Sequence, residues 1–111
     1  MAQILITGSN SGFAKLAALS LARKGHHVVA TMRNLSKGQD LLDLAEKEQL
    51  SLETKQLDVT NPESIASCIE HPEEIDVLIN NAGFEVQAAI EQIDDELMLQ
   101  QLETNVFGPL R

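Results

Sequence analysis

The feature that most constrains this chain is the segment from Gln3 to Ala14, where a short apolar strand runs into a glycine- and serine-rich turn and then into an alanine-rich helix. Backbone N–H groups in such a turn, together with the positive end of the helix, form a site for a phosphate group. Gly8 and Gly12 are the critical positions, because a side chain there would block the phosphate. The glycine spacing differs from the dinucleotide fingerprint. The turn by itself is therefore compatible with either a phosphate-binding site or an ordinary strand-to-helix loop.

Four short aliphatic runs alternate with helical segments along the chain. The expected strands cover residues 3–6, 27–31, 52–57 and 76–79. The expected helices cover residues 13–24 and 36–48, a segment that starts near 60–63, and one that follows 93–96. Three of the runs are apolar almost throughout, as in parallel strands covered by helices, whereas 52–57 alternates and is expected at a sheet edge. We therefore predict an α/β protein with an incomplete, Rossmann-like doubly wound parallel sheet of four strands in the order 3-2-1-4.

Capping signals set the expected helix bounds. Gly25 is the residue preferred just past a helix end, so the first helix stops before it. Ser36 is expected to cap the second helix, with a glutamine three residues later completing the motif. Thr60 or Asn61 is expected to cap the third, with Pro62 in its first turn.

The charge distribution is uneven along the chain. Residues 1–39 hold five Lys or Arg and no acid, whereas residues 40–111 hold three Lys or Arg and seventeen acids, so the net charge of −9 divides into +5 and −14. A cationic region limited to the segment with the glycine turn suits a phosphorylated small ligand, and an acidic remainder argues against a nucleic-acid partner. Charges placed by chance on solvated helix faces are the alternative.

Length and composition narrow the class further. The 111 residues are 43% hydrophobic, which suffices for one domain with a single core. Cys68 is the only cysteine, so an intrachain disulfide and a thiolate metal cluster are excluded, and burial as a small apolar residue is expected. The three histidines lack metal-ligand spacing. Without a leader pattern or a long apolar window, we expect a cytoplasmic protein with no membrane span.

A second motif, Asn80-Asn81-Ala82-Gly83, follows the fourth expected strand. Together with Thr7, Gly8 and Gly12 it resembles the short-chain dehydrogenase/reductase family, whose pattern is Thr-Gly-x-x-x-Gly-x-Gly followed by Asn-Asn-Ala-Gly. Ala14 stands at the third glycine of that pattern, where its methyl group is expected to crowd the turn and weaken cofactor binding.

The resemblance extends over essentially the whole chain, residues 4–111. Asp58-Val59 follows the third strand, where the family places an aspartate near the adenine, and Asn105 lies in a segment that resembles the family's helix with an active-site asparagine. The resemblance implies that Asn105 supports catalysis by holding a proton-relay water. The expected cofactor-binding residues are Thr7, Gly8, Ser9, Ser11, Gly12, Phe13, Arg33, Asp58, Val59, Asn80, Ala82 and Gly83. A helix cap remains the alternative for Asp58, and a plain turn for Asn80 and Asn81.

The end of the second strand indicates which nicotinamide cofactor would bind. An NAD site usually offers an acid there to bind the adenosine ribose. This chain has no Asp or Glu before Asp40, and Arg33 stands where it could meet the 2′-phosphate of NADP. NADP(H) is therefore preferred, with NAD(H) as the alternative. Lys15 and Lys37 are expected to be surface residues.

The sequence contains no tyrosine. Hydride transfer to a carbonyl needs a proton donor, and the resemblance implies a tyrosine assisted by a lysine four residues later and by a serine. We therefore expect residues 1–111 to be an NADP(H)-binding Rossmann half-domain truncated before that segment, inactive as it stands, from an oxidoreductase with a small carbonyl or alcohol substrate.

Two other functions remain open from the sequence. One is a non-catalytic dinucleotide-binding protein complete at 111 residues. The other is an interaction protein, including a homo-oligomer, that pairs through the open sheet edge or through the helix face of Met98, Leu102 and Val106.

Overall fold

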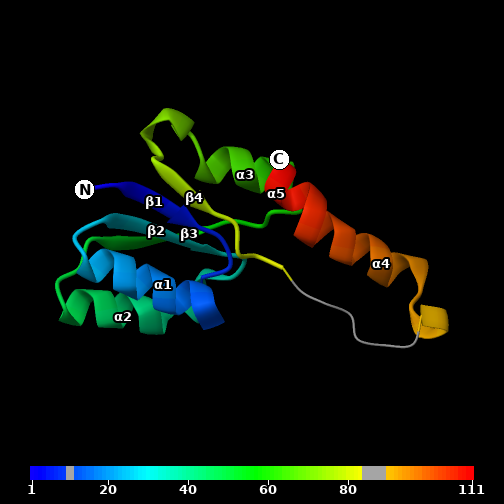
Figure 1. Ribbon diagram of the computed structural model, residues 1–111, viewed down its shortest axis with the longest axis horizontal. Coiled ribbons are helices and arrows are strands. Elements are labelled where there is room, and N and C mark those ends of the chain that lie inside the picture. The colour runs from blue at the N-terminus through cyan, green and yellow to red at the C-terminus, as the bar shows by residue number, and fades with distance from the viewer. Residues whose placement is uncertain (10–11, 84–89) are drawn as a thin grey trace.

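The computed structural model describes residues 1–9, 12–83 and 90–111, and its centre is a four-stranded parallel sheet (Figure 1). The strands are β1 (Gln3–Ile6), β2 (His27–Met32), β3 (Leu52–Gln56) and β4 (Val77–Ile79). Their order is β3-β2-β1-β4, with Ile4 beside both Val28 and Val77. The predicted Rossmann-like α/β class and the strand order 3-2-1-4 are confirmed, and the alternating strand β3 lies at an edge as predicted.

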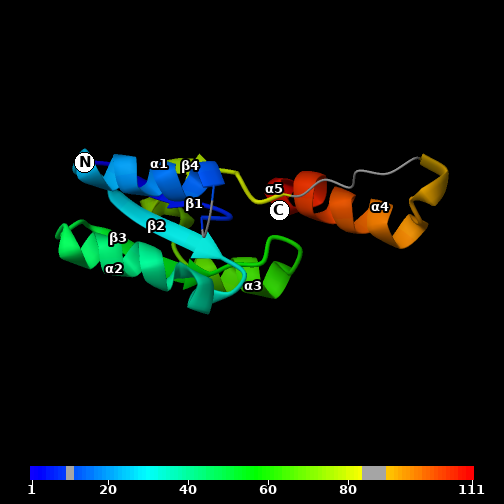
Figure 2. The same ribbon diagram turned by 90° about the horizontal axis from the view of Figure 1, so that it is seen from below.

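Helices cover both faces of the sheet. They are α1 (Gly12–Arg23), α2 (Gln39–Lys47), α3 (Pro62–Cys68), α4 (Asp95–Leu102) and α5 (Gly108–Leu110). Figures 1 and 2 show α1 and α2 on one face and α3 on the other, while α4 extends away from the sheet. A π-helical turn, Glu103–Phe107, joins α4 to α5. Within the ranges described, no helix has the length and apolar character needed to cross a membrane.

The helix caps agree with the sequence in two places and differ in one. Gly25 follows α1 with a φ of +92°, and the Asn61 side chain caps α3 by accepting hydrogen bonds from the N–H groups of Glu63 and Ser64. The prediction that Ser36 caps α2 is wrong. Asn34 caps a 3-10 turn, Leu35–Gly38, and α2 begins only at Gln39. The reason is local: both the N–H and the hydroxyl of Ser36 donate to the Asn34 side chain.

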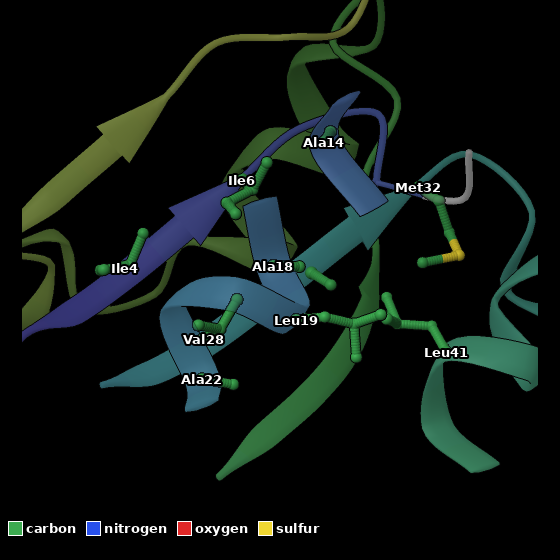
Figure 3. Packing of buried hydrophobic residues seen from close by; sticks show 10 residues of the cluster. Ile4, Ile6, Ala14, Ala18, Leu19, Ala22, Val28, Met32 and Leu41 are labelled. Carbon is green, nitrogen blue, oxygen red and sulfur yellow. The ribbon is translucent and has the colours of Figure 1, made fainter. Parts of the chain in front are cut away.

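The two faces of the sheet bury separate apolar clusters. Successive residues of a strand point to opposite faces, so Ile4 and Ile6 of β1 pack toward α1, whereas Leu5 packs toward α3. Figure 3 shows the first cluster, where the side chain of Leu19 of α1 lies against that of Leu41 of α2. Full burial of such an aliphatic side chain contributes about 1.5–3 kcal/mol. This packing holds the start of α1 against the end of β1, which positions the glycine turn.

One edge of the sheet is apolar and open to solvent. The side chains of Val77 and Leu78 on β4 are 42% and 49% exposed. This follows from the strand order, which places β4 at an edge of the sheet.

Candidate dinucleotide-binding site

A cleft of about 820 Å³ lies at the carboxyl ends of the four strands. Each strand contributes the residues that follow it, so segments distant in the sequence meet at one edge of the sheet, which is where ligands bind in open α/β sheets. The cleft is lined by Gly8, Gly12, Phe13, Arg33, Asn34, Lys37, Leu57, Asp58, Val59, Asn81, Ala82, Gly83 and Thr104.

The glycine turn forms the part of the cleft best suited to an anion. Gly8 and Gly12 have φ values of +67° and +64°, a backbone conformation that glycine adopts without strain. Gly12 also begins the 12-residue helix α1, whose first turn holds no acidic side chain. The partial positive charge of the helix start and the N–H groups of its first turn therefore meet no carboxylate from that turn.

Thr7 joins the glycine turn to the segment after β4. Its Oγ1 accepts hydrogen bonds from the N–H groups of Asn81 and Ala82, both at 3.0 Å, and its own N–H donates to the carbonyl of Ile79. The Asn81 side chain donates to the carbonyl of Gly8 at 3.2 Å. A Cβ added to Gly8 would lie 2.9 Å from the Cα of Ala82. The two motifs recognised in the sequence are thus packed backbone against backbone.

The second strand adds positive charge to the cleft. Arg33 follows β2 and is exposed, and the 3-10 turn begun by Asn34 brings Lys37 to the same cleft. Lys37 is exposed, as expected for a surface residue, and it also lines the cleft. Two cations and a helix start with no acid in its first turn suit a phosphorylated ligand.

Asp58 supplies the negative group of the cleft and is held by Thr60. Both the N–H and the hydroxyl of Thr60 donate to its Oδ1, at 2.9 and 2.6 Å. Burial raises the pKa of the Asp58 carboxyl, but these hydrogen bonds and the charge of Arg33 outweigh burial and bring the pKa below its usual value. Asp58 therefore stays ionised at neutral pH, and it does not cap α3, which Asn61 caps instead.

The lowered pKa of Asp58 predicts a pH-dependent contribution to stability. A pKa that is lower in the folded than in the unfolded chain favours folding above the unfolded pKa of about 3.9, and this contribution is lost as the pH falls through the folded pKa. Urea titrations should therefore show the free-energy gap between the native protein and Asp58→Asn shrinking from about pH 5 to about pH 3. A gap that stayed constant or widened toward acid would contradict the assignment.

Asn105 lies next to the glycine that ends the second motif. A Cβ added to Gly83 would lie 2.8 Å from the Oδ1 of Asn105, so the side chain of Asn105 meets the backbone of Gly83. Asn105 sits within the π-helical turn, a distortion frequent at functional sites. Gly108, one helical turn further, lets the chain approach β3: a Cβ there would lie 2.7 Å from the side chain of Val59.

The structure brings most of the predicted site residues together. Those lining the cleft are Gly8, Gly12, Phe13, Arg33, Asp58, Val59, Ala82 and Gly83. Thr7 and Ser9 are buried behind the turn, at 3% and 0% exposed. Ser11 lies outside the described residues. The residue of the asparagine pair that lines the cleft is Asn81, whereas Asn80 is exposed and does not line it.

Several residues that line the cleft were not predicted from the sequence. Leu57 and Thr104 carry no sequence signal, whereas Asn34 and Lys37 could have been found from the cap that precedes Ser36.

Ala14, at the third glycine position of the family pattern, was expected to crowd the turn. Ala14 is 2% exposed and belongs to the apolar core shown in Figure 3, so it packs on the sheet and does not line the cleft. Among the described residues, no group of His, Cys, Asp and Glu side chains could hold a metal ion.

Comparison with known proteins gives consistent matches over the whole chain. A family model described as short chain dehydrogenase matches residues 2–111. An uncharacterized oxidoreductase of Bacillus subtilis, YusZ, is 41% identical over 109 residues, which are 94% of this chain and 39% of that protein. Human retinol dehydrogenase 8 is 40% identical over 114 residues, 97% of this chain and 36% of that protein. This chain thus spans about two fifths of the length of these relatives.

The solved structures agree with the sequence comparison. An actinorhodin polyketide ketoreductase variant, determined with NADPH, superimposes with a TM-score of 0.87 at 30% identity. The match covers 99% of this chain and 44% of the ketoreductase. The fold of this chain is therefore shared with an enzyme of known structure.

Proposed function

Because the chain belongs to the short-chain dehydrogenase family, we propose that residues 1–111 form the cofactor-binding part of an NADP(H)-dependent oxidoreductase that interconverts a small carbonyl compound and its alcohol. The observation that carries the proposal is the cleft that places Arg33 and the glycine turn in one site. The bound nicotinamide cofactor supplies or accepts the hydride.

The residues of the cleft divide into three proposed roles. Gly8 and Gly12 leave room for the pyrophosphate, and the start of α1 binds it through backbone N–H groups. Arg33 binds the 2′-phosphate, and Asp58 with Val59 borders the adenine. The segment after β4, from Asn81 to Gly83, lies beside the remainder of the cofactor.

The preference for NADP(H) is supported by charge. The cleft offers Arg33 and Lys37 beside the end of β2, with no Asp or Glu between residues 1 and 39 to repel a 2′-phosphate. Among the described residues that line the cleft, the one acid is Asp58, which follows β3. A related ketoreductase has been determined with NADPH, which supports the same preference.

Proton transfer is proposed to depend on Asn105 together with residues outside this chain. Reduction of a carbonyl needs a proton donor at the developing alkoxide, and the chain has no tyrosine to serve as one. Asn105, fixed beside Gly83, is proposed to hold a water molecule in the relay that refills that donor. The relatives, more than twice as long as this chain, have room for the donor and the substrate pocket.

Calorimetric titration of the intact protein with NADPH and with NADH tests the proposal. We expect NADPH to bind at least about tenfold more tightly, because a charge-assisted hydrogen bond contributes about 1.5–3 kcal/mol. Tighter binding of NADH would overturn the cofactor assignment, and failure to bind either dinucleotide would overturn the proposed site. Tight NADPH binding without turnover of any carbonyl substrate would favour a non-catalytic dinucleotide-binding protein.

A further inference from the structure

We propose that Thr31 is a positioning residue that sets the spacing between the glycine turn and Arg33, and thereby the preference of the site for NADP(H) over NAD(H). The inference rests on the proposed function and extends it to a residue behind the cleft. Thr31 is fully buried and is not among the residues that line the cleft.

Three hydrogen bonds link Ile6, Ser9 and Thr31, and two of them join the end of β2 to β1 and the glycine turn. The hydroxyl groups of Thr31 and Ser9 both donate to the carbonyl oxygen of Ile6, at 2.8 and 2.9 Å. The N–H of Ser9 donates to the carbonyl oxygen of Thr31 at 2.9 Å. All three residues are 0% exposed. We call Ile6, Ser9 and Thr31 the hydroxyl clamp.

The hydroxyl clamp lies where the sheet ladder between β1 and β2 has ended. The last paired residues of β1 and β2 are Ile6 and Ala30, and from there to Met32 β2 pairs with β3 but not with β1. Beyond this point regular strand pairing no longer fixes the distance between the two chain segments. The two hydroxyl groups add side-chain hydrogen bonds to one carbonyl oxygen at this point, in a site that excludes water.

The clamp connects the two groups that a 2′-phosphorylated dinucleotide must reach at once. Ser9 directly follows Gly8 in the phosphate-binding turn, and Thr31 lies two residues before Arg33. NADPH carries a pyrophosphate for the turn and a 2′-phosphate for Arg33, so its affinity depends on their spacing, whereas NADH has no phosphate for Arg33. Loosening the clamp should weaken binding of NADPH more than binding of NADH, because the second contact forms only when the geometry is preorganised.

The test is the ratio of NADH to NADPH dissociation constants, measured by calorimetry on the intact protein. In Thr31→Val, which keeps the branched shape and removes the hydroxyl, we expect the ratio to fall about fivefold, the effect of one buried hydrogen bond. Thr31→Ser retains the hydroxyl and should restore most of the ratio. Thr54→Val removes a hydroxyl from the neighbouring strand, outside the cleft, and should leave the ratio unchanged.

A structural role alone would lower thermal stability and weaken both dinucleotides equally, so an unchanged ratio in Thr31→Val would overturn the inference. Should that variant fail to fold, Ser9→Ala decides, because it removes the other hydroxyl and leaves the N–H bond in place. We expect its ratio to fall too, and a native ratio would overturn the inference. If the unmutated protein binds neither dinucleotide, the proposed function is wrong, and the inference, which rests on it, is wrong as well.

Discussion

Replacing Gly8 by alanine is expected to weaken NADPH binding more than about 100-fold and to lower the free energy of unfolding by about 3 kcal/mol. Two causes act together. The φ of +67° is strained for any residue with a Cβ, and that Cβ would lie 2.9 Å from the Cα of Ala82. Neither backbone can yield without displacing the other motif, because Thr7 ties the turn to Asn81 and Ala82. Calorimetry with NADPH and urea unfolding would measure the two effects.

Gly25→Ala is the matched control for the Gly8 substitution. Gly25 also has a positive φ, of +92°, but a Cβ there would meet nothing within 4 Å, and the residue lies past the far end of α1. This variant should lose only about 1 kcal/mol of stability through backbone strain and should bind NADPH normally. If Gly8→Ala bound NADPH as Gly25→Ala does, the close contact between the two motifs would have no part in cofactor binding.

Replacing Arg33 by alanine is expected to weaken NADPH binding about 30-fold while NADH binding changes less than about twofold, since the lost contact is a charge-assisted hydrogen bond to a phosphate that NADH lacks. The difference between the two cofactors should shrink as the salt concentration rises, because Arg33 is exposed and its charge is screened. Paired calorimetric titrations at low and high salt would measure both effects.

Arg23→Ala removes the same charge far from the cleft, where Arg23 pairs with Glu48, and should leave both affinities unchanged. If Arg33→Ala bound NADPH with native affinity, the assignment of Arg33 to the 2′-phosphate would be wrong. The same titration on Lys37→Ala would then show whether the second cation of the cleft binds the 2′-phosphate. Equal losses for NADPH and NADH in Arg33→Ala would instead mean that Arg33 supports the site as a whole.

The local patterns of the chain were sufficient to predict the order of the helices and strands and the part of the site formed by the glycine turn. Strands 3–6 and 76–79 were readable because near-continuous apolar runs mark parallel strands buried on both faces. The glycine turn was readable because its function depends on adjacent residues. Where two local signals competed, as Asn34 and Ser36 did before α2, the pattern did not decide, because either side chain can cap a helix and only the folded backbone shows which one does.

The sequence by itself determined the α/β class, the glycine turn and the absence of an acid directly after β2, because each depends only on residues that are neighbours in the chain. Only the tertiary structure decided that Asn81, and not Asn80, lines the cleft, because a shift of one residue in extended chain turns a side chain to the opposite side. It likewise decided that Thr7 meets Ala82 and that Thr31 meets Ile6. These hydrogen bonds join residues 75 and 25 positions apart, and their partners are chosen by strand order and register, which no local pattern contains.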